Sequence, residues 1–338
     1  DTTRELVIDP VLEYASYFGG SLVEEGVDVA VDAGGNTYVV GITTSSDLPR
    51  LDALDDIYDA DLDLGNAFPD VFITKVDPLG NVIFSTYLGG GGGFDVAKAL
   101  DLDAAGNIVI AGFTDSEFFP VTPDAFQPIP GGATSLFGGD GFITKLAPDG
   151  ASLVYSSFVG STSGDVVEDI ALDGDGAVYL VGETNSLRFW TTPGAFQRSH
   201  ADPGVFPFID DQAANSDGFV VKLAADGSLV YSTLLGGPGE DLFTDIAIDA
   251  SGQARVAGQT RADGLPAPGA THATRAGLSD AYVATISADG STVIHGTYLG
   301  GGADEAAMDL AIDALGRSVI VGWTESADFD TMSPLALY

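Results

Sequence analysis

The chain has 338 residues, 45% of them hydrophobic, and a mean hydropathy of +0.22, so it carries enough apolar surface to fold and is not typical of disordered proteins. Its formal net charge of −38 disfavours anionic partners, and we expect neither nucleic acid nor membrane insertion. The absence of cysteine excludes disulfides, thiolate nucleophiles and zinc–thiolate sites, and no apolar run approaches the roughly 18 residues that a membrane span needs.

The first predicted element is an apolar segment, LVIDPVLEYASYFGG, from Leu6 to Gly20. After it, one pattern recurs five times: two apolar stretches flank Asp-x-x-Gly, and the second ends in Gly and often Thr. The copies read VAVDAGGNTYVVGIT, ALDLDAAGNIVIAGFT, IALDGDGAVYLVGET, IAIDASGQARVAGQT and LAIDALGRSVIVGWT. Their turn aspartates are Asp32, Asp103, Asp173, Asp249 and Asp313, and their closing glycines are Gly41, Gly112, Gly182, Gly258 and Gly322. Each copy predicts a β-hairpin, strands a and b, because Asp bonds nearby amides and Gly takes a positive φ.

A second predicted hairpin, strands c and d, follows each of the first four copies. These segments are DVFITKVDPLGNVIFSTYLGG, DGFITKLAPDGASLVYSSFVG, DGFVVKLAADGSLVYSTLLGG and DAYVATISADGSTVIHGTYLGG. Four short strands per repeat, with turn aspartates 64 to 76 residues apart, are typical of the blades of a β-propeller.

The fifth repeat lacks a c–d hairpin of its own, and the segment Leu6–Gly20 matches VDPLGNVIFSTYLGG with a shortened turn. We therefore predict an all-β fold, a five-bladed β-propeller of four-stranded antiparallel blades over residues 1–338. The N-terminal c–d hairpin is expected to pair with the C-terminal a–b hairpin at Ser318–Thr324, which removes exposed sheet edges. The predicted blades are residues 21–90, 91–160, 161–237, 238–301, and 302–338 together with 1–20. Alternatively, the hairpin completes the ring of a neighbouring copy and gives head-to-tail polymers.

The repeats resemble the SBBP β-propeller repeat family of bacteria and archaea, whose members read close to DAFVAKLDPDGSLVYSTYLGG followed by AIAVDAAGNVYVTGYT. The resemblance covers essentially the whole chain. It implies a propeller, an extracellular or cell-surface location and no shared catalytic residues. The family is described as seven-bladed, whereas this sequence supplies five blades, so the blade number stays open if the chain is a fragment.

Acidic residues recur at two fixed positions before the turn aspartates. Eight residues before stands the first carboxylate set: Glu24, Asp95, Asp165, Asp241 and Glu305. Four residues before stands the second carboxylate set, with Ala99 in the second repeat: Asp28, Asp169, Asp245 and Asp309. Strand a is innermost in a propeller, so we expect the first set around the mouth of the central channel and the second set deeper. Rings of hard oxygen ligands suit Ca²⁺, but the same residues can instead cap amides in the Gly-rich turns between strands d and a.

The connections between strands b and c are long and varied, whereas the hairpin turns are short. They span Thr43–Pro69, Asp115–Gly139, Asn185–Ser216 and Arg261–Ser279. We expect this b–c loop face to meet protein or glycan partners, including copies of the chain itself. The loop aromatics Phe118, Phe119, Phe189 and Trp190 are candidates for stacking on a sugar, with simple packing as the alternative. Phe126 and Phe196 are expected to be buried loop anchors. The stretch Asp52–Gly65 matches a calcium loop only weakly, and we prefer an acidic solvated insertion.

The sequence offers little for catalysis. His200, His272 and His295 fall in different contexts, and no G-x-S-x-G motif occurs. We expect a non-enzymatic extracellular or cell-surface module with a structural or interaction role, cation-stabilised and self-assembling in one version. One alternative is a lectin-like glycan-binding module that uses the b–c loops. Another is a glycan-active hydrolase or lyase that uses acidic residues.

Overall fold

The computed structural model describes residues 15–55, 57–58, 68–131, 138–201 and 212–330. These residues form β-strands and connections and contain no helix, which confirms the all-β prediction. It follows that this part of the chain holds no helix able to span a membrane.

The described residues form eighteen strands, in the order a, b, c, d that the repeats predict. The strands a are β1 (Glu24–Val31), β5 (Asp95–Leu102), β9 (Asp165–Leu172), β13 (Asp241–Ile248) and β17 (Glu305–Ile312). The strands b are β2 (Thr37–Thr43), β6 (Ile108–Thr114), β10 (Val178–Ser186), β14 (Ala254–Thr260) and β18 (Ser318–Thr324). The strands c are β3 (Asp70–Val76), β7 (Asp140–Leu146), β11 (Gln212–Leu223) and β15 (Asp280–Ile286). The strands d are β4 (Val82–Leu88), β8 (Leu153–Val159), β12 (Leu229–Leu235) and β16 (Val293–Leu299).

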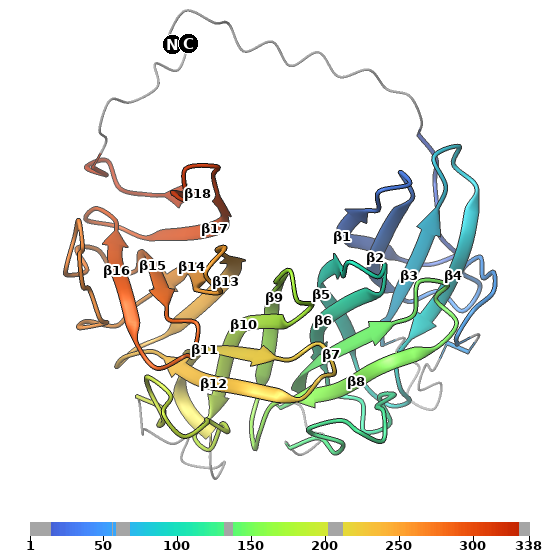
Figure 1. The fold of residues 1–338 in the computed structure, drawn as a ribbon, viewed down its shortest axis with the longest axis horizontal. Coiled ribbons are helices and arrows are strands. Elements are labelled where there is room, and N and C mark those ends of the chain that lie inside the picture. Colours follow the sequence, from blue (N-terminus) through green and yellow to red (C-terminus); the bar gives the residue numbers. More distant parts are fainter. Residues whose placement is uncertain (1–14, 56, 59–67, 132–137, 202–211, 331–338) are drawn as a thin grey trace, which may run out of the picture.

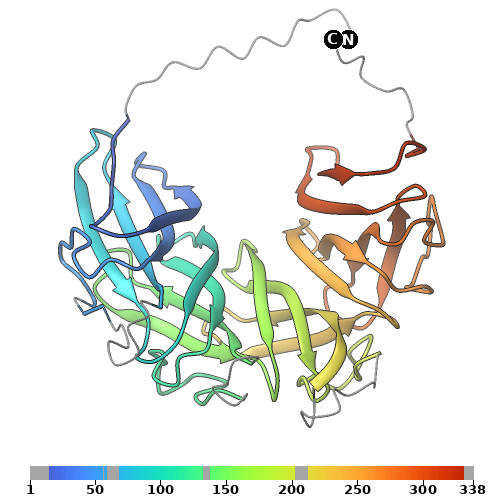
Figure 2. The same ribbon diagram turned by 180° about the vertical axis from the view of Figure 1, so that it is seen from behind.

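Each of the first four repeats forms an antiparallel sheet of four strands in sequence order, and β17 pairs with β18 in a fifth sheet of two strands. The sheets stand side by side along an arc, with the strands a innermost, in contact from one sheet to the next (Figure 1; Figure 2 from behind). We call the interface between consecutive sheets a joint. The first and fifth sheets lie at the two ends of the arc, and its closure into a ring is not confirmed.

The a–b turns form as the sequence predicts. In the first repeat, Asp32 Oδ1 accepts hydrogen bonds from the amides of Gly34 and Asn36, both 2.9 Å long, and the Gly35 amide donates to the Asp32 carbonyl. Gly35 has a φ of 79°, which a residue with a Cβ rarely adopts. The same bond from a glycine amide to the aspartate carbonyl recurs in the other four a–b turns, at Asp103, Asp173, Asp249 and Asp313.

A β-bulge in each strand a explains the closing glycines. In the first sheet the register shifts between Gly26 and Asp28, directly opposite Gly41. A Cβ on Gly41 would lie 2.1 Å from the Glu25 carbonyl oxygen, and the other four closing glycines meet a strand-a carbonyl in the same way. A side chain at this position would therefore force the two strands apart.

The core lies in the joints, because each sheet buries apolar side chains against the next sheet. The same positions meet at every joint: a strand-b residue packs against two strand-a residues of the following sheet. These groups are Val40 with Ala97 and Leu100, Ala111 with Val167 and Ile170, Val181 with Phe243 and Ile246, and Ala257 with Ala307 and Leu310.

The predicted pairing of residues 6–20 with β18 stays a prediction. Residues 6–14 lie outside the described part of the chain. Residues 15–20 are described and form no strand, and Phe18 packs against Phe72 of the first sheet, with ring centroids 6.0 Å apart. Among the described residues, β18 pairs with β17 alone.

Candidate functional site

The first carboxylate set sits where each strand a begins, at the joint with the preceding sheet. Asp95, Asp165, Asp241 and Glu305 are fully buried, and Glu24 is half-buried. We expected the first set around the mouth of a central channel. The described members are instead enclosed by protein.

These carboxylates accept hydrogen bonds from two neighbouring parts of the chain. The threonine that ends strand b donates its hydroxyl to the carboxylate of its own sheet in the pairs Thr43–Glu24 (3.0 Å), Thr114–Asp95 (2.5 Å), Thr260–Asp241 and Thr324–Glu305 (2.7 Å). Amides of the d–a turns also donate, in the pairs Gly90–Asp95 (2.9 Å), Ser161–Asp165 (2.6 Å), Gly237–Asp241 (2.7 Å) and Gly301–Glu305 (2.9 Å). The geometry is that of amide capping, one of the two roles we expected.

A further group of acids, which the sequence reasoning missed, lies beside the first set. Each strand c carries a buried aspartate that pairs with a threonine of strand b, and we call these the strand-c aspartates: Asp70, Asp140, Asp217 and Asp280. A Cβ on Gly89 would lie 2.8 Å from Asp95 Oδ2 and 2.9 Å from Asp70 Cγ, so this glycine fits between carboxyl groups of consecutive sheets. The Asp95 amide donates to the Pro69 carbonyl, 2.8 Å, which fixes the start of strand a against strand c of the sheet before it.

The strand-c aspartates hold the b–c loops. Asp140 Oδ2 accepts from the Gln127 side chain, 2.8 Å, and from the Gly131 amide, 2.6 Å. In the next sheet, Asp217 Oδ2 accepts from Gln197, 2.9 Å, and from the Ala201 amide, 2.8 Å. The joints that follow the second and third sheets thus each bring together a b–c loop, a strand-c aspartate, a first-set carboxylate and a d–a turn.

Burial changes the acidity of these groups. It raises the pKa of Asp95 to about 8 and that of Asp241 to about 7, and it raises the pKa of Asp165 well above the ordinary value. The adjacent strand-c aspartate raises the pKa further in each case, since two like charges close together in a buried joint disfavour ionisation. Burial acts the same way on Glu305, but hydrogen bonds from Ser326, Gly301 and Thr324 outweigh it and lower that pKa.

The second carboxylate set reaches forward to the next sheet. Asp28 Oδ2 accepts from the Leu100 amide, 2.7 Å, Asp169 Oδ2 from the Ile246 amide, 2.9 Å, and Asp245 Oδ2 from the Leu310 amide, 2.7 Å. Burial raises the pKa of Asp169 to about 6 and that of Asp245 to about 8. We call these contacts forward latches, and the joint at Ala99 has none because alanine offers no acceptor.

Both carboxylate sets were candidate calcium ligands. Among the residues that the structure describes, no three acidic or histidine side chains lie close enough together to hold a metal ion. Asp59, Asp61 and Asp63 of the weak calcium-loop match lie outside the described residues. Calcium binding stays a prediction.

The loop aromatics are used in packing. Phe189 is 4% exposed and stacks between Phe219 and Trp190, with centroids 4.8 and 5.0 Å away. The Trp190 indole donates to the Gly160 carbonyl, 2.8 Å, and packs edge-on against Phe126. Phe196 is 37% exposed, so the prediction that it is buried was wrong.

The b–c loops also run along the outer strands d. The Thr122 amide donates to the Ser156 carbonyl, 3.0 Å, and the Phe158 amide donates to the Gln127 carbonyl, 3.2 Å. In the first sheet, Leu51 pairs with Ser85. These bonds cover edges that would otherwise be open to other strands.

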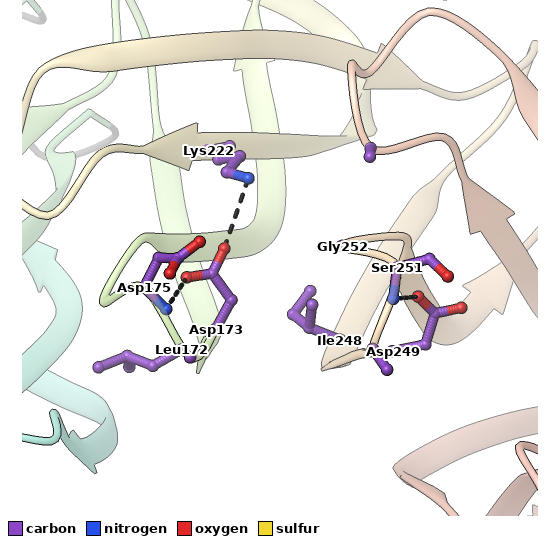
Figure 3. A pocket seen from close by; sticks show the side chains of 11 residues that line it. Leu172, Asp173, Asp175, Lys222, Ile248, Asp249, Ser251 and Gly252 are labelled. Atoms are coloured by element: carbon purple, nitrogen blue, oxygen red, sulfur yellow. Dashed lines mark hydrogen bonds and ion pairs between the residues drawn. The ribbon is translucent and has the colours of Figure 1, made fainter.

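A cavity opens on the face opposite to the b–c loops, at the joint between the third and fourth sheets (Figure 3). It has a volume of about 540 Å³ and is lined by the turns at Asp173 and Asp249 and by Lys222. Lys222 Nζ lies 3.5 Å from Asp173 Oδ2 and 2.6 Å from the Tyr179 hydroxyl. Lys75 and Lys145 make the equivalent ion pairs with Asp32 and Asp103, so three of the four lysines hold a turn aspartate.

The histidines do not converge. Buried His200 contacts the Thr184 carbonyl and Asp217, His272 lies 3.5 Å from Asp330, and His295 contacts the Gly269 carbonyl. The chain matches no protein-family model and no curated protein.

Proposed function

We propose that this chain is a closed five-bladed β-propeller of the SBBP repeat type that acts as a non-enzymatic structural or interaction module outside the cell or at its surface. The observation that carries the proposal is the repetition of one joint. The same buried carboxylates and apolar positions recur from sheet to sheet, so these buried carboxylates serve to hold a rigid scaffold for the b–c loops.

The position of Phe18 supports closure through the N-terminal segment. In the repeat alignment, Phe18 is equivalent to Leu88, Val159 and Leu235, which end the strands d. Each of those residues lies in one core cluster with the aromatic residue of the next strand c, namely Phe142, Phe219 or Tyr282. Phe18 packs against Phe72, the equivalent aromatic of the first sheet. Residues 15–20 therefore lie on the first sheet as the end of a preceding strand d would.

The second feature that supports closure is the edge of β18. Strands β2, β6, β10 and β14 each have a strand a on one edge and a strand c on the other. Beside β18, the joint between the fourth and fifth sheets holds a hollow of about 270 Å³, whose apolar lining includes Leu299, Ile320 and Trp323. A c–d hairpin formed by residues 6–20 fits this place, because it would pair the edge and cover the hollow.

Removal of Asp1–Gly20 tests the closure. The shortened chain loses the strands that complete the fifth sheet, and we expect its melting temperature to fall by at least about 5 °C, since about 1 kcal/mol corresponds to a few degrees in a protein of this size. Scrambling residues 6–14 within the full-length chain is the matched control, because it keeps the length and composition. An unchanged melting temperature in both variants would rule out closure by this segment.

The exposed loop residues support the interaction role. Phe118 is 74% exposed in the second b–c loop, although Phe119 beside it is buried. Ile129 and Leu278 are similarly exposed in the described parts of these loops. Apolar side chains presented in this way on a rigid frame are typical of binding surfaces.

Two assays separate this role from its alternatives. We expect no release of reducing ends from a panel of plant, bacterial and animal polysaccharides and no signal on a glycan array. Release of product by the wild-type chain would replace the module with a glycan-active enzyme. Array binding lost in Phe118→Ser would replace it with a lectin.

A further inference from the structure

Three phenylalanine rings lie on the b–c loop face at the joint between the first and second sheets, and we call them the phenylalanine surface: Phe68, Phe94 and Phe118. Phe118 is 74% exposed, Phe94 is 42% exposed and Phe68 is half-buried. Phe68 leads into strand c of the first sheet, and Phe94 precedes strand a of the second sheet, with their ring centroids 4.7 Å apart. Two consecutive sheets therefore contribute apolar rings to one surface.

A run of glycines lies between the two exposed rings. These residues, Gly89–Gly93, form the d–a turn that leads from the first sheet to the second. A Cβ on Gly90 would lie 2.5 Å from the Phe118 carbonyl carbon, so the turn packs its backbone directly on the b–c loop. A Cβ on Gly91 or Gly92, in contrast, would meet nothing within 4 Å. The middle of the turn is therefore open backbone between the two phenylalanines.

Hydrogen bonds hold this turn and this loop in place. The Phe94 amide donates to Asp115 Oδ1, and the Asp115 amide donates to the Phe94 carbonyl, 3.1 Å. Buried Asp95 Oδ2 accepts from the Gly90 amide and from the Ser116 hydroxyl, both 2.9 Å long. The surface is therefore formed before any partner arrives, which keeps the entropic cost of binding low.

The repeat forms without these two phenylalanines. Phe94 immediately precedes a first-set carboxylate, and Phe118 stands four residues after the threonine that ends strand b. The equivalents of Phe94 are Val23, Gly164, Glu240 and Asp304, and those of Phe118 are Asp47, Arg188, Gly264 and Asp328. Only Val23 among these equivalents carries an apolar side chain, so folding does not need an aromatic ring at either position. Exposed aromatic rings of this kind are typical of binding surfaces.

The charge around the rings favours a cationic partner. Glu117, next to Phe118, is exposed, and the net charge of the chain is −38. The chain binds its own ammonium groups with the same two kinds of side chain, a carboxylate and an aromatic ring. Lys75 Nζ lies 4.6 Å from the centroid of the Tyr38 ring and 3.9 Å from Asp32 Oδ2. The phenylalanine surface offers this combination to a cationic group from outside the chain.

We infer that the phenylalanine surface binds an arginine-rich segment of a partner protein, with guanidinium groups over the rings of Phe94 and Phe118 and the segment's backbone against the open glycine turn. Arginine fits better than lysine, because its planar guanidinium group stacks on a ring face and is more weakly hydrated than an ammonium group. The inference rests on the proposed interaction role, and it names the surface and the kind of partner. A second copy of this chain does not fit, since its net charge is also −38.

Binding of a model peptide tests the inference in the full-length chain. The probe is a fluorescein-labelled octapeptide of alternating Arg and Gly, read by fluorescence anisotropy at physiological ionic strength. We expect Phe94→Ala with Phe118→Ala to weaken its binding at least about tenfold, as the loss of two cation–π contacts implies. The matched control, Leu79→Ala with Leu278→Ala, removes two exposed apolar side chains elsewhere and should stay within about twofold of wild type. Equal affinity of the wild type and the phenylalanine variant would show binding by charge alone and overturn the inference, as would no binding to the wild type.

A single cysteine reports where the peptide binds, because the chain has no other. Gly91→Cys places an acrylodan label in the open middle of the glycine turn, and Leu79→Cys places it in an exposed c–d turn of the first sheet. We expect the Arg-Gly octapeptide to shift the emission of the label at Gly91 to shorter wavelength and to leave the label at Leu79 unchanged. Equal shifts at both positions, or none at Gly91, contradict the inference.

The alternatives give different readings. If Phe94 and Phe118 serve packing, their double variant has a lower melting temperature and unchanged peptide binding, which overturns the inference. A glycan-array signal that this variant loses would assign the surface to sugars and also overturn it. The proposed function fails on other evidence, namely product release from polysaccharides or an unchanged melting temperature after deletion of residues 1–20, and neither depends on these two rings.

Discussion

The interior joints and the two ends of the arc contain the same residue types and differ in what covers them. Ile246 of the fourth sheet and Val29 of the first sheet occupy equivalent strand-a positions, yet one is buried under Val181 and the other faces solvent. The difference teaches that an apolar side chain of this protein is buried only where a neighbouring sheet covers it, and not by its own sheet. Each sheet supplies half of a core and depends on its neighbour for the other half.

The largest expected effect is on the pH dependence of stability, because the interior joints bury acids in their neutral form. The pKa is raised to about 8 for Asp95 and about 7 for Asp241, so the folded chain holds protons that the unfolded chain loses above about 4. The stabilisation is therefore complete at low pH and is lost as the pH rises through 7 to 8.

We expect the free energy of unfolding, measured in urea, to be lower at pH 9 than at pH 5 by several kcal/mol, at about 1.4 kcal/mol for each unit of pKa shift. Asp95→Asn, which stays neutral, should reduce the difference in the free energy of unfolding between the two pH values. Glu305→Gln in the fifth sheet should not, since its pKa is lowered. Equal stability at the two pH values would contradict the buried, protonated joints.

A smaller effect on the free energy of unfolding is expected when an apolar residue of an interior joint is compared with its equivalent at an end of the arc. Ile246→Ala should lower the free energy of unfolding by about 2–5 kcal/mol, because it leaves a cavity in a closed joint. Val29→Ala should cost about 1–3 kcal/mol if the fifth sheet covers it, and close to nothing in an open arc. Chemical denaturation of both variants sharpens the comparison, and a neutral Val29→Ala would contradict the sealed ring.

The smallest expected effect concerns the joint without a forward latch. Ala99→Asp offers an acceptor to the Ile170 amide, as Asp28 does to Leu100. We expect a gain of about 1 kcal/mol, since one hydrogen bond to a charged group is offset in part by desolvation. Ala99→Asn is the control that adds an acceptor without charge. A loss of stability in both variants would show that the latches contribute little.

The hairpins of all five repeats could be predicted from the sequence, because alternating apolar residues and Asp-x-x-Gly turns act over short distances. The first carboxylate set was also found in this way, as a column of acids at fixed spacing from Asp32 and its equivalents. Its role was not resolved, since amide capping and cation binding need the same residue types.

The contacts across the joints could not be predicted from the spacing. An aspartate equivalent to Asp70 recurs visibly in each strand c, but its neighbour Asp95 belongs to the next sheet, and only the arrangement of sheets brings the two together. The hydrogen bond from the Gln127 side chain to Asp140 could not be predicted for the same reason. The exposure of Phe196 against the half-burial of Phe126 depends on how each loop lies over its sheet, which the shared motif does not encode.

At each joint, strand b of one sheet packs against strand a of the following sheet, and this fixed direction affects how such a molecule could change in evolution. Because each sheet meets the next through the same few positions, a tandem duplication of one unit of about 70 residues would create a new joint already furnished with its partners. The number of sheets could then change by recombination in register, with no surface to be invented afresh.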